Sequence, residues 1–372
     1  MRILMLNYEF PPLGGGASPI SYEIAKQLSK IGDLKIDLIT MGFKDLPSEE
    51  KLNDNLTIHR VRCLRTKKEI CHPWEQLTYL FAGYKKAKEL LKKNDYAICY
   101  SHFIIPTGAL AWKLKRKFNL PYVITSHGSD VLGYNPRFKL LYPLLIRKWR
   151  KIVKNAMFIT TPSRFLGEKI IEILPEVTNK IKVIHNGIDQ NKFLAHPKEN
   201  RILMVARLLD YKGVQDVIKA LTLIKLKTWE VDIVGEGPLK EELIEQVKRS
   251  NLDDKVFFHG WVDNKSVEMK NLYGKASIFI SASYFENLSV VLLEALSAGC
   301  HVLASDVGGN PEVIKEDNLF PAKNSKALAL KLKKLINSLE IKQGVVPNKF
   351  HWEGIITQYS DLLRIEHEGK EN

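Results

Sequence analysis

Short runs of β-branched and apolar residues alternate with longer amphipathic stretches along nearly the whole chain. In the first half, strands are predicted at 3–6, 36–40, 97–100, 122–125, 158–161 and 181–184. Helical periodicity fills most of the intervals between them, for example over 22–29 and 77–91. This alternation predicts parallel strands joined by crossover helices.

The same alternation resumes after a polar segment, 191–200, that is typical of a linker. The strands predicted beyond it are 202–205, 231–234, 256–258, 278–281 and 302–305. We therefore expect an α/β fold of two doubly wound, Rossmann-like parallel-sheet domains, over 1–193 and 200–348. The segment 349–372 is expected to form a helix that packs back on the first domain. Such sheets bind ligands beyond the carboxyl ends of their strands, so two facing domains would frame a cleft.

The composition is that of an ordinary folded protein. Its 372 residues exceed one usual core and suit two domains, and 45% are hydrophobic while 26% are charged. The first apolar run is interrupted at 9–12, and no stretch reaches the roughly 18 apolar residues of a membrane span. The four cysteines show no Cys-x-x-Cys spacing, which argues against a metal or disulfide framework. We expect a cytoplasmic protein.

The formal net charge of +14 owes much to basic runs before residue 160. Two predicted helices carry cations at 85–93 and 113–117, and a third segment, 138–154, mixes leucines and Trp149 with cations. These runs fit either solvated helix faces or a surface that docks on the anionic inner face of the cell membrane. No zinc-finger or RNP pattern accompanies the charge, so nucleic acid is not an expected partner.

Candidate chemistry lies in the loops that follow predicted strands. The first loop contains consecutive glycines, 14–16, before a helix, where backbone N–H groups can approach an anion. It is not a dinucleotide fingerprint, because Pro19 occupies the third glycine position. His127 and Asp130 directly follow another strand, where a cleft would lie. A local backbone hydrogen bond is the alternative role for His127.

Two cations follow the first strand of the second half. Arg207 comes directly after that strand, and Lys212 precedes the next helix. An arginine fork and a lysine point charge beside a helix N-terminus suit a diphosphate. Glycine-containing turns at 235–238 and 260–263 end the next two strands and would shape a nucleotide pocket, although such turns need no ligand.

The most specific segment spans residues 281–294. Glu286 lies in the loop after a strand, and Glu294 lies in the helix that follows. A carboxylate accepts two hydroxyl hydrogen bonds, which suits the vicinal diol of a sugar or ribose, and the helix N-terminus between them offers N–H groups to phosphate. Burial of Glu294 among its apolar neighbours would be unfavourable without a partner. An exposed position on a surface helix is the alternative.

Together these segments resemble the retaining, GT-B-fold glycosyltransferases of family four, also called glycosyl transferase group 1. The resemblance covers nearly the whole chain. It rests on the glycine-rich first loop and on residues 127–130, 185–189, 206–208, 212–213, 235–238, 286–294, 298–302 and 308–312.

The resemblance implies that the second domain binds a nucleotide-sugar donor, UDP- or GDP-linked, and the first domain a glycan or lipid-linked acceptor. The catalytic residues that it implies are His127, Glu286, Arg207 and Lys212. The donor-binding residues that it implies are Gly15, Gly16, Arg207, Lys212, Gly237, Val262, Glu286, Leu288, Ser289, Val290 and Glu294. Leu288 and Ser289 depart from the residues common in the family, which leaves the sugar open. The implied activity is hexosyl transfer with retention, in cell-envelope polysaccharide or glycolipid synthesis.

No cofactor or metal is expected. The sequence lacks Asp-x-Asp, and cationic side chains with a helix dipole can stabilise a leaving diphosphate. A sugar-nucleotide epimerase of the same fold stays an alternative, and it would need acid/base residues facing the donor but no acceptor site. A non-enzymatic basic protein that binds membrane or nucleic acid is another, although it leaves Glu286 and Glu294 unexplained.

Overall fold

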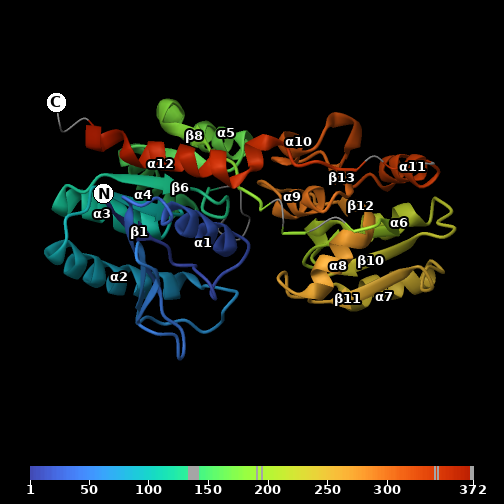
Figure 1. Ribbon diagram of the computed structural model, residues 1–372, viewed down its shortest axis with the longest axis horizontal. Helices are drawn as coiled ribbons and strands as arrows, with labels where there is room; N and C mark the ends of the chain where they lie inside the picture. Colours follow the sequence, from blue (N-terminus) through green and yellow to red (C-terminus); the bar gives the residue numbers. More distant parts are fainter. Residues whose placement is uncertain (133–141, 190–191, 194–195, 339–340, 342, 369–372) are drawn as a thin grey trace. The chain divides into compact units, whose positions relative to one another are not determined.

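The computed structural model of the chain describes residues 1–132, 142–189, 192–193, 196–338, 341 and 343–368 (Figure 1). These residues form two compact units: unit 1 is Met1–His185 with Trp352–Asn372, and unit 2 is Asn186–His351. The division falls at His185 rather than at residue 193. The reason is that Ile188 bridges to His351 and the buried Phe193 packs on Tyr273, so this stretch belongs to the second core.

Unit 1 is built on an eight-stranded sheet with the order β3-β4-β2-β1-β5-β6-β7-β8. Its strands are β1 (Arg2–Leu6), β2 (Lys35–Met41), β3 (Glu49–Asn53), β4 (Leu56–Val61), β5 (Ile98–His102), β6 (Tyr122–Thr125), β7 (Ile159–Thr161) and β8 (Ile181–Val183). All neighbours pair in parallel except β3 and β4, which are antiparallel. The predicted parallel sheet is therefore present, with one antiparallel edge strand, β3, that the sequence did not predict because it is too polar to resemble a buried strand.

The helices of unit 1 are α1 (Ala17–Leu28), α2 (Pro73–Lys93), α3 (Thr107–Phe118), α4 (Tyr142–Asn155), α5 (Arg164–Ile173) and α12 (Trp352–Glu368), with a 3₁₀ turn at Pro175–Lys180. Leu4 of β1 shares a core with Tyr79 of α2 and Leu110 of α3. The last helix, α12, packs on α1, and its Arg364 forms a salt bridge with Asp33 at 2.7 Å. In the described part of the chain, no helix combines the length and apolarity needed to cross a bilayer.

Unit 2 has a six-stranded parallel sheet with the order β11-β10-β9-β12-β13-β14. Its strands are β9 (Glu199–Val205), β10 (Glu230–Val234), β11 (Val256–Gly260), β12 (Ala276–Ser281), β13 (His301–Ser305) and β14 (Leu319–Phe320). Its helices are α6 (Val214–Leu221), α7 (Lys240–Arg249), α8 (Val267–Lys275), α9 (Val290–Ser297), α10 (Asn310–Val313) and α11 (Ser325–Ile336), with 3₁₀ turns at Asp210–Lys212, Glu316–Asn318 and Asn348–Phe350.

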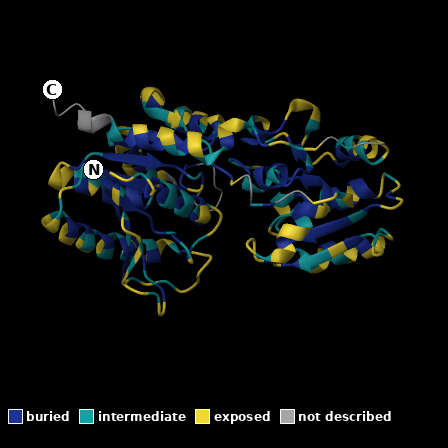
Figure 2. Cartoon of the chain, viewed as in Figure 1, coloured by how far each residue is buried: buried dark blue, intermediate teal, exposed yellow. Residues whose placement is uncertain are grey.

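The alternation of side chains along the strands divides the interior of unit 2 into two cores. Ile202 and Met204 of β9 pack with residues of α6, α7 and α11, whereas Leu203 packs with residues of α8 and α9. The sheet is therefore covered on both faces, and Figure 2 shows mostly buried ribbon along its central strands, while the edge strand β11 is partly exposed. Both sheets match the predicted doubly wound Rossmann-like architecture.

The strand orders bring particular loops together. In unit 2, the chain winds outward from β9 and then returns to place β12 against the other side of β9. In unit 1, β5 returns beside β1 in the same way. Such reversals in strand order are where open α/β sheets bind ligands, beyond the carboxyl ends of the two strands. The loops after β9 and β12 lie at this reversal in unit 2, and the loops after β1 and β5 lie at the one in unit 1.

Candidate active site

The loops after β9 and β12 bring two predicted residues into contact. Lys212 ends the short 3₁₀ turn that precedes α6, and its Nζ forms an ion pair with Glu286 Oε1. Ser283 Oγ donates to the same carboxylate oxygen at 2.8 Å. Both charged side chains are less than one fifth exposed, so their attraction is less screened than at an open surface. The strand order explains this pairing of residues that lie far apart in the chain.

Glycines hold the loops of this edge against one another. At Gly308, which has φ +55°, a Cβ would overlap the backbone carbonyl oxygen of Glu286. At Gly235, which has φ +141°, it would overlap the carbonyl oxygen of Ala206. Only glycine allows these backbones to approach so closely. The loops after β10 and β13 therefore fix the backbone that precedes Arg207 and the backbone of Glu286.

Arg207 is exposed and is joined to the loop after β12 through an aromatic pair. Its guanidinium donates to the Tyr211 hydroxyl at 3.0 Å, and the Tyr211 ring stacks on Phe285 at 4.5 Å between centroids. The Tyr284 N–H also donates to the Tyr211 carbonyl at 2.8 Å. Arg207 and Lys212 are thus both attached to the segment that carries Glu286. The sequence indicated the two cations but not the aromatic link between the loops.

Glu294 is buried in α9, with only 3% of the residue exposed. Its Oε1 accepts hydrogen bonds from Lys192 Nζ at 2.7 Å and Asn264 Nδ2 at 2.9 Å, and its Oε2 accepts one from the Tyr273 hydroxyl at 3.0 Å. These three donors stabilise the buried carboxylate and offset the free-energy cost of burying it. Sequence reasoning missed all three donors, since they come from the predicted linker, a loop and another helix.

The other predicted donor-binding residues of unit 2 lie at the start of α9 or in the loops after β10 and β11. Ser289 is the buried N-cap residue of α9, and Val290 is its first helical residue. Leu288 and Val262 are buried in the core shared with α8 and α9. Gly237 packs against the backbone of Leu208, so its lack of a side chain has a structural reason as well.

In unit 1, His127 follows β6 and pairs with a histidine that the sequence did not single out. His102 Nδ1 lies 3.0 Å from His127 Nε2, and the two rings stack with centroids 5.3 Å apart. Burial lowers the pKa of His127 to about 3 and that of His102 well below its usual range. Both rings are therefore neutral at pH 7, and one N–H joins the two facing nitrogens. Nε2 of the fully buried His102 has no hydrogen-bond partner among the described residues.

Asp130 supports this loop through backbone contacts. Its carboxylate accepts hydrogen bonds from the N–H groups of Ile104 at 2.7 Å and His127 at 3.0 Å, and from Ser126 Oγ at 3.0 Å. Burial raises its pKa, and these hydrogen bonds act in the opposite direction. Asp130 thus ties the loop after β6 to the loop after β5, which supports a structural role for it.

The glycine-rich loop after β1 divides into a constrained glycine and two open ones. Gly14 has φ +100°, and a Cβ there would contact Glu9. Gly15 and Gly16, the two predicted donor-binding positions, are exposed and have no atom within 4 Å of an added Cβ. Gly16 is also the N-cap of α1 and provides no side chain to the first turn, so backbone N–H groups of α1 stay without a side-chain cap.

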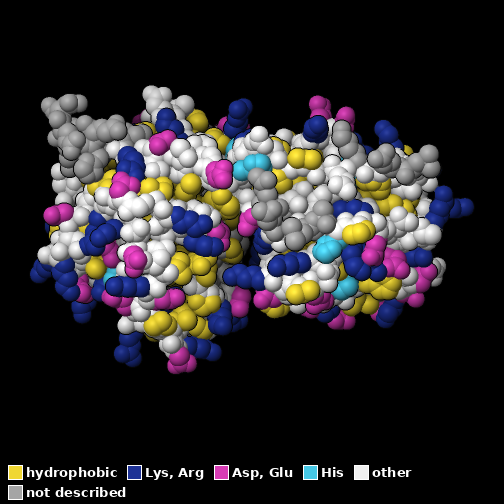
Figure 3. All heavy atoms as spheres, in the orientation of Figure 1, with side chains coloured by type: hydrophobic (Ala, Val, Ile, Leu, Met, Phe, Trp, Pro, Cys, Tyr) yellow, Lys and Arg dark blue, Asp and Glu magenta, His cyan; other side chains and the backbone are white. Residues whose placement is uncertain are grey.

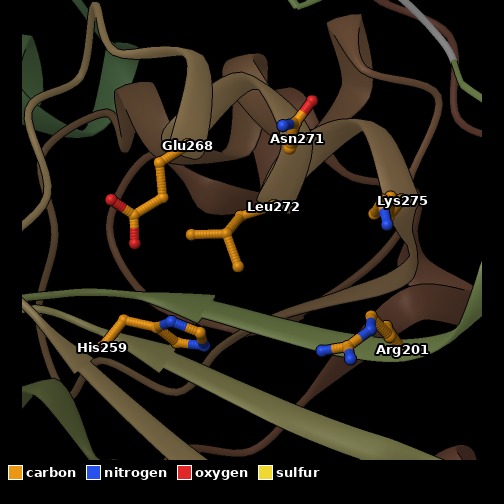
Figure 4. A pocket seen from close by; sticks show the side chains of 6 residues that line it. All are labelled: Arg201, His259, Glu268, Asn271, Leu272 and Lys275. Carbon is orange, nitrogen blue, oxygen red and sulfur yellow. The ribbon is translucent and has the colours of Figure 1, made fainter.

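A separate pocket of about 430 Å³ lies in unit 2 between α8 and the sheet (Figure 4). Arg201 and His259 line it from the strands, and Glu268, Asn271, Leu272 and Lys275 line it from α8. Most of its charges are already paired: Arg201 with Glu199, Glu230 and Asp232, His259 with Asp232, and Lys275 with Glu199. Its position and internal pairing separate it from the Lys212–Glu286 site.

Family models and solved structures assign this chain to the same class of protein. Residues 14–192 match the family model described as Glycosyltransferase Family 4, and residues 187–349 match the model described as Glycosyl transferases group 1. The solved structure of sucrose-phosphate synthase from Thermosynechococcus elongatus superposes with a TM-score of 0.82 at 20% identity, covering 99% of each chain. The fold and the two family matches make this chain a glycosyltransferase of the GT-B type.

Individual relatives extend over the same length. An uncharacterized glycosyltransferase of Methanocaldococcus jannaschii is 27% identical over 98% of both chains. The N-acetyl-alpha-D-glucosaminyl L-malate synthase of Bacillus anthracis is 26% identical, over 96% of this chain and 97% of its own. The structure of Anabaena HepE in complex with UDP-glucose has a TM-score of 0.73 at 19% identity, and the match covers 98% of this chain and 99% of that one.

Proposed function

We propose that this glycosyltransferase moves a hexose-type sugar from a UDP- or GDP-linked donor to a glycan or lipid-linked acceptor, with retention of configuration. The observation that carries the proposal is the Lys212–Glu286 pair beside Ser283, where the order of the unit 2 strands reverses. A cation and a hydroxyl-binding carboxylate at one ligand-binding edge suit a phosphorylated sugar. The relatives named above, which include a protein solved with UDP-glucose, support a nucleotide-sugar donor.

Charge stabilisation at the leaving group follows from the cations of unit 2. As the bond between the sugar and the diphosphate breaks, negative charge grows on the phosphate oxygens, and Lys212 and Arg207 are cations on this edge that can stabilise it. Lys212 is held by Glu286 and can share its ammonium protons with a phosphate oxygen. Glu286 then keeps an oxygen for a sugar hydroxyl. These residues would stabilise the charge of the leaving group without a metal.

His127 serves this reaction as a neutral group. With its pKa near 3, it carries no positive charge at pH 7 and does not act as a cationic acid. A neutral imidazole can donate or accept one hydrogen bond to a sugar hydroxyl, depending on its tautomer. Its contact with His102 links the tautomers of the two rings. In a retaining reaction, the proton of the acceptor hydroxyl would go to an oxygen of the departing phosphate.

We further propose that the reaction belongs to the synthesis of cell-envelope polysaccharide or glycolipid, on the cytoplasmic side of the membrane. The basic character of unit 1 supports an acceptor presented at an anionic surface. Unit 1 contains 33 lysines and arginines against 21 aspartates and glutamates, whereas unit 2 contains 23 against 21. On the face seen in Figure 3, Lys and Arg side chains are spread over unit 1.

A donor screen tests the proposal directly. UDP-, GDP- and ADP-sugars are compared for thermal stabilisation of the chain, and the stabilising donor is then followed for release of nucleoside diphosphate. We expect one nucleotide class to stabilise the protein and to be turned over in the presence of EDTA. Loss of turnover on chelation, with recovery on addition of Mg²⁺ or Mn²⁺, would contradict the metal-free mechanism. Interconversion of sugar nucleotides without acceptor would favour the epimerase.

A further inference from the structure

One face of α2 exposes large apolar side chains in the described part of unit 1, although the ring of His72 stacks on that of Trp74. Trp74, Leu77 and Phe81 are 48%, 56% and 77% exposed, and their spacing puts them on one side of the helix. Leu64 is also exposed, and its backbone N–H donates to Thr78 Oγ1 of α2 at 3.1 Å, which places it beside this face. Figure 2 shows exposed ribbon recurring along α2, on the outer side of unit 1.

The same face continues into cations over the last three turns of the helix. The residues that form the whole stripe, at spacings of three and four, are Trp74, Leu77, Phe81, Lys85, Lys88 and Lys92. The three lysines are exposed and form no ion pair among the described residues. Of the acidic residues of α2, Glu75 is buried, and Glu89 pairs with Lys86 and Lys93 beside the stripe. We name this surface the α2 stripe.

The α4 segment, from which a membrane surface was expected, presents less apolar surface than its sequence indicates. Its Trp149, Ile152 and Val153 are completely buried in the core of unit 1, while Leu144 stays exposed. Its cations Arg147, Lys148, Arg150 and Lys151 are exposed. Phe138, Leu140 and Leu141 lie outside the described residues. In its described part, α4 therefore offers a cationic face with little apolar surface, whereas α2 offers both.

We propose that the α2 stripe docks unit 1 on an anionic lipid surface. This inference rests on the proposed function in one respect, namely that the acceptor is lipid-linked. The stripe has exposed aromatic and aliphatic side chains at one end and unpaired lysines at the other. This arrangement matches a bilayer interface, where an apolar acyl-chain layer lies beneath a layer of charged headgroups. The first two turns would enter the boundary between headgroups and acyl chains, and the last three would lie over phosphate groups. Acidic side chains are absent from the stripe, which removes repulsion from the lipid.

The expected strength follows from the composition of the stripe. Each lysine near an anionic surface strengthens binding about fivefold, so three of them contribute roughly a hundredfold. Each apolar side chain that leaves water strengthens binding further, by about tenfold or more when it is fully covered. Binding should therefore be reversible, should need both halves of the stripe and should weaken as salt screens the lysines.

Sedimentation of the full-length chain with vesicles tests this surface. Vesicles of phosphatidylcholine, with and without phosphatidylglycerol, are mixed with the protein at about 0.1 M and about 1 M salt. We expect wild-type protein to sediment only with the anionic vesicles and mainly at low salt. Replacing Lys85, Lys88 and Lys92 with glutamine should weaken binding by roughly a hundredfold, and Leu77→Ser with Phe81→Ser should weaken it to a similar extent.

Two control variants make the test specific. The first changes an equally exposed set on α11 of unit 2, Lys326, Lys333 and Lys334 to glutamine and Leu330, which is 72% exposed, to serine. The second replaces Arg147, Lys148, Arg150 and Lys151 of α4 with glutamine. We expect both to bind vesicles within a few-fold of wild type. Larger losses in the α4 variant than in the α2 variants would assign docking to α4 and overturn the proposal.

Other outcomes also test whether the α2 stripe docks on lipid. The proposal is overturned if wild-type protein does not sediment with anionic vesicles at low salt. It is also overturned if wild-type protein self-associates and the Phe81→Ser change abolishes that self-association. Turnover of the donor with a soluble acceptor is measured in parallel. The α2 variants should retain it, because none of the changed residues belongs to the proposed active site. Absence of turnover in wild-type protein would instead reject the proposed function and leave the vesicle result to stand alone.

Discussion

The replacement Glu294→Gln tests the donor-binding role that the sequence predicts for this carboxylate against the structural role seen in α9. A carboxylate has about four lone-pair positions, and Lys192, Asn264 and Tyr273 occupy three of them. One position is left for a ribose hydroxyl. Loss of one hydrogen bond to a charged acceptor costs about 1.5–3 kcal/mol, so we expect the Kd of the donor to rise by roughly 10- to 150-fold.

The fold should survive this change with a modest loss of stability. Glutamine keeps the volume and one acceptor, and Lys192 and Asn264 are exposed enough to reach water. The Tyr273 hydroxyl is completely buried and must find a new partner, which costs about 1–2 kcal/mol. Tyr273→Phe is the matched control, because it removes a contact to Glu294 without touching the free position. It should destabilise unit 2 similarly and leave donor affinity within about twofold.

Calorimetric titration with the donor found in the screen, together with urea unfolding of each variant, measures both effects. The reasoning fails if Glu294→Gln weakens donor binding no more than Tyr273→Phe does. It also fails if both variants lose affinity in proportion to stability, since the carboxylate would then act only as a structural hub of α9.

Three further predictions concern the remaining parts of the two units. Arg207→Ala and Lys212→Ala should each lower kcat more than they raise KM, because their charges matter most as the diphosphate leaves; steady-state kinetics showing the reverse would make them ground-state binders. Burial lowers the pKa of His102, so its contribution to stability is complete above the ordinary histidine pKa of about 6.5 and is lost as the pH falls below it. His102→Gln should therefore lose less stability than wild type between about pH 7 and pH 5 in urea unfolding, and an identical loss would contradict the neutral pair with His127. Gly235→Ala should destabilise unit 2 by about 3 kcal/mol or more, because its Cβ would overlap the backbone of the loop after β9; a change below about 1 kcal/mol would show that this loop can move aside.

Periodicity along the chain was enough to predict the class of fold. Buried parallel strands are short and apolar, and the helices between them repeat every three to four residues, so both signals are local. The edge strand β3 was missed because it is polar and half exposed, which removes the local signal. Its neighbour β4 was missed as well, although it is mostly buried. The reason for glycine at 235 and 308 became visible only in the structure, where a positive φ and a close backbone approach require that residue type.

Contacts between segments that lie far apart in the chain could not be predicted from local sequence patterns. Lys212 meets Glu286, and His102 meets His127, because strand order places their loops side by side, and no local pattern records strand order. The apolar faces of α2 and α4 likewise look alike as sequence. Folding buries Trp149 of α4 in the core and leaves Phe81 of α2 in water, since the side that a helix presents depends on the elements packed against it.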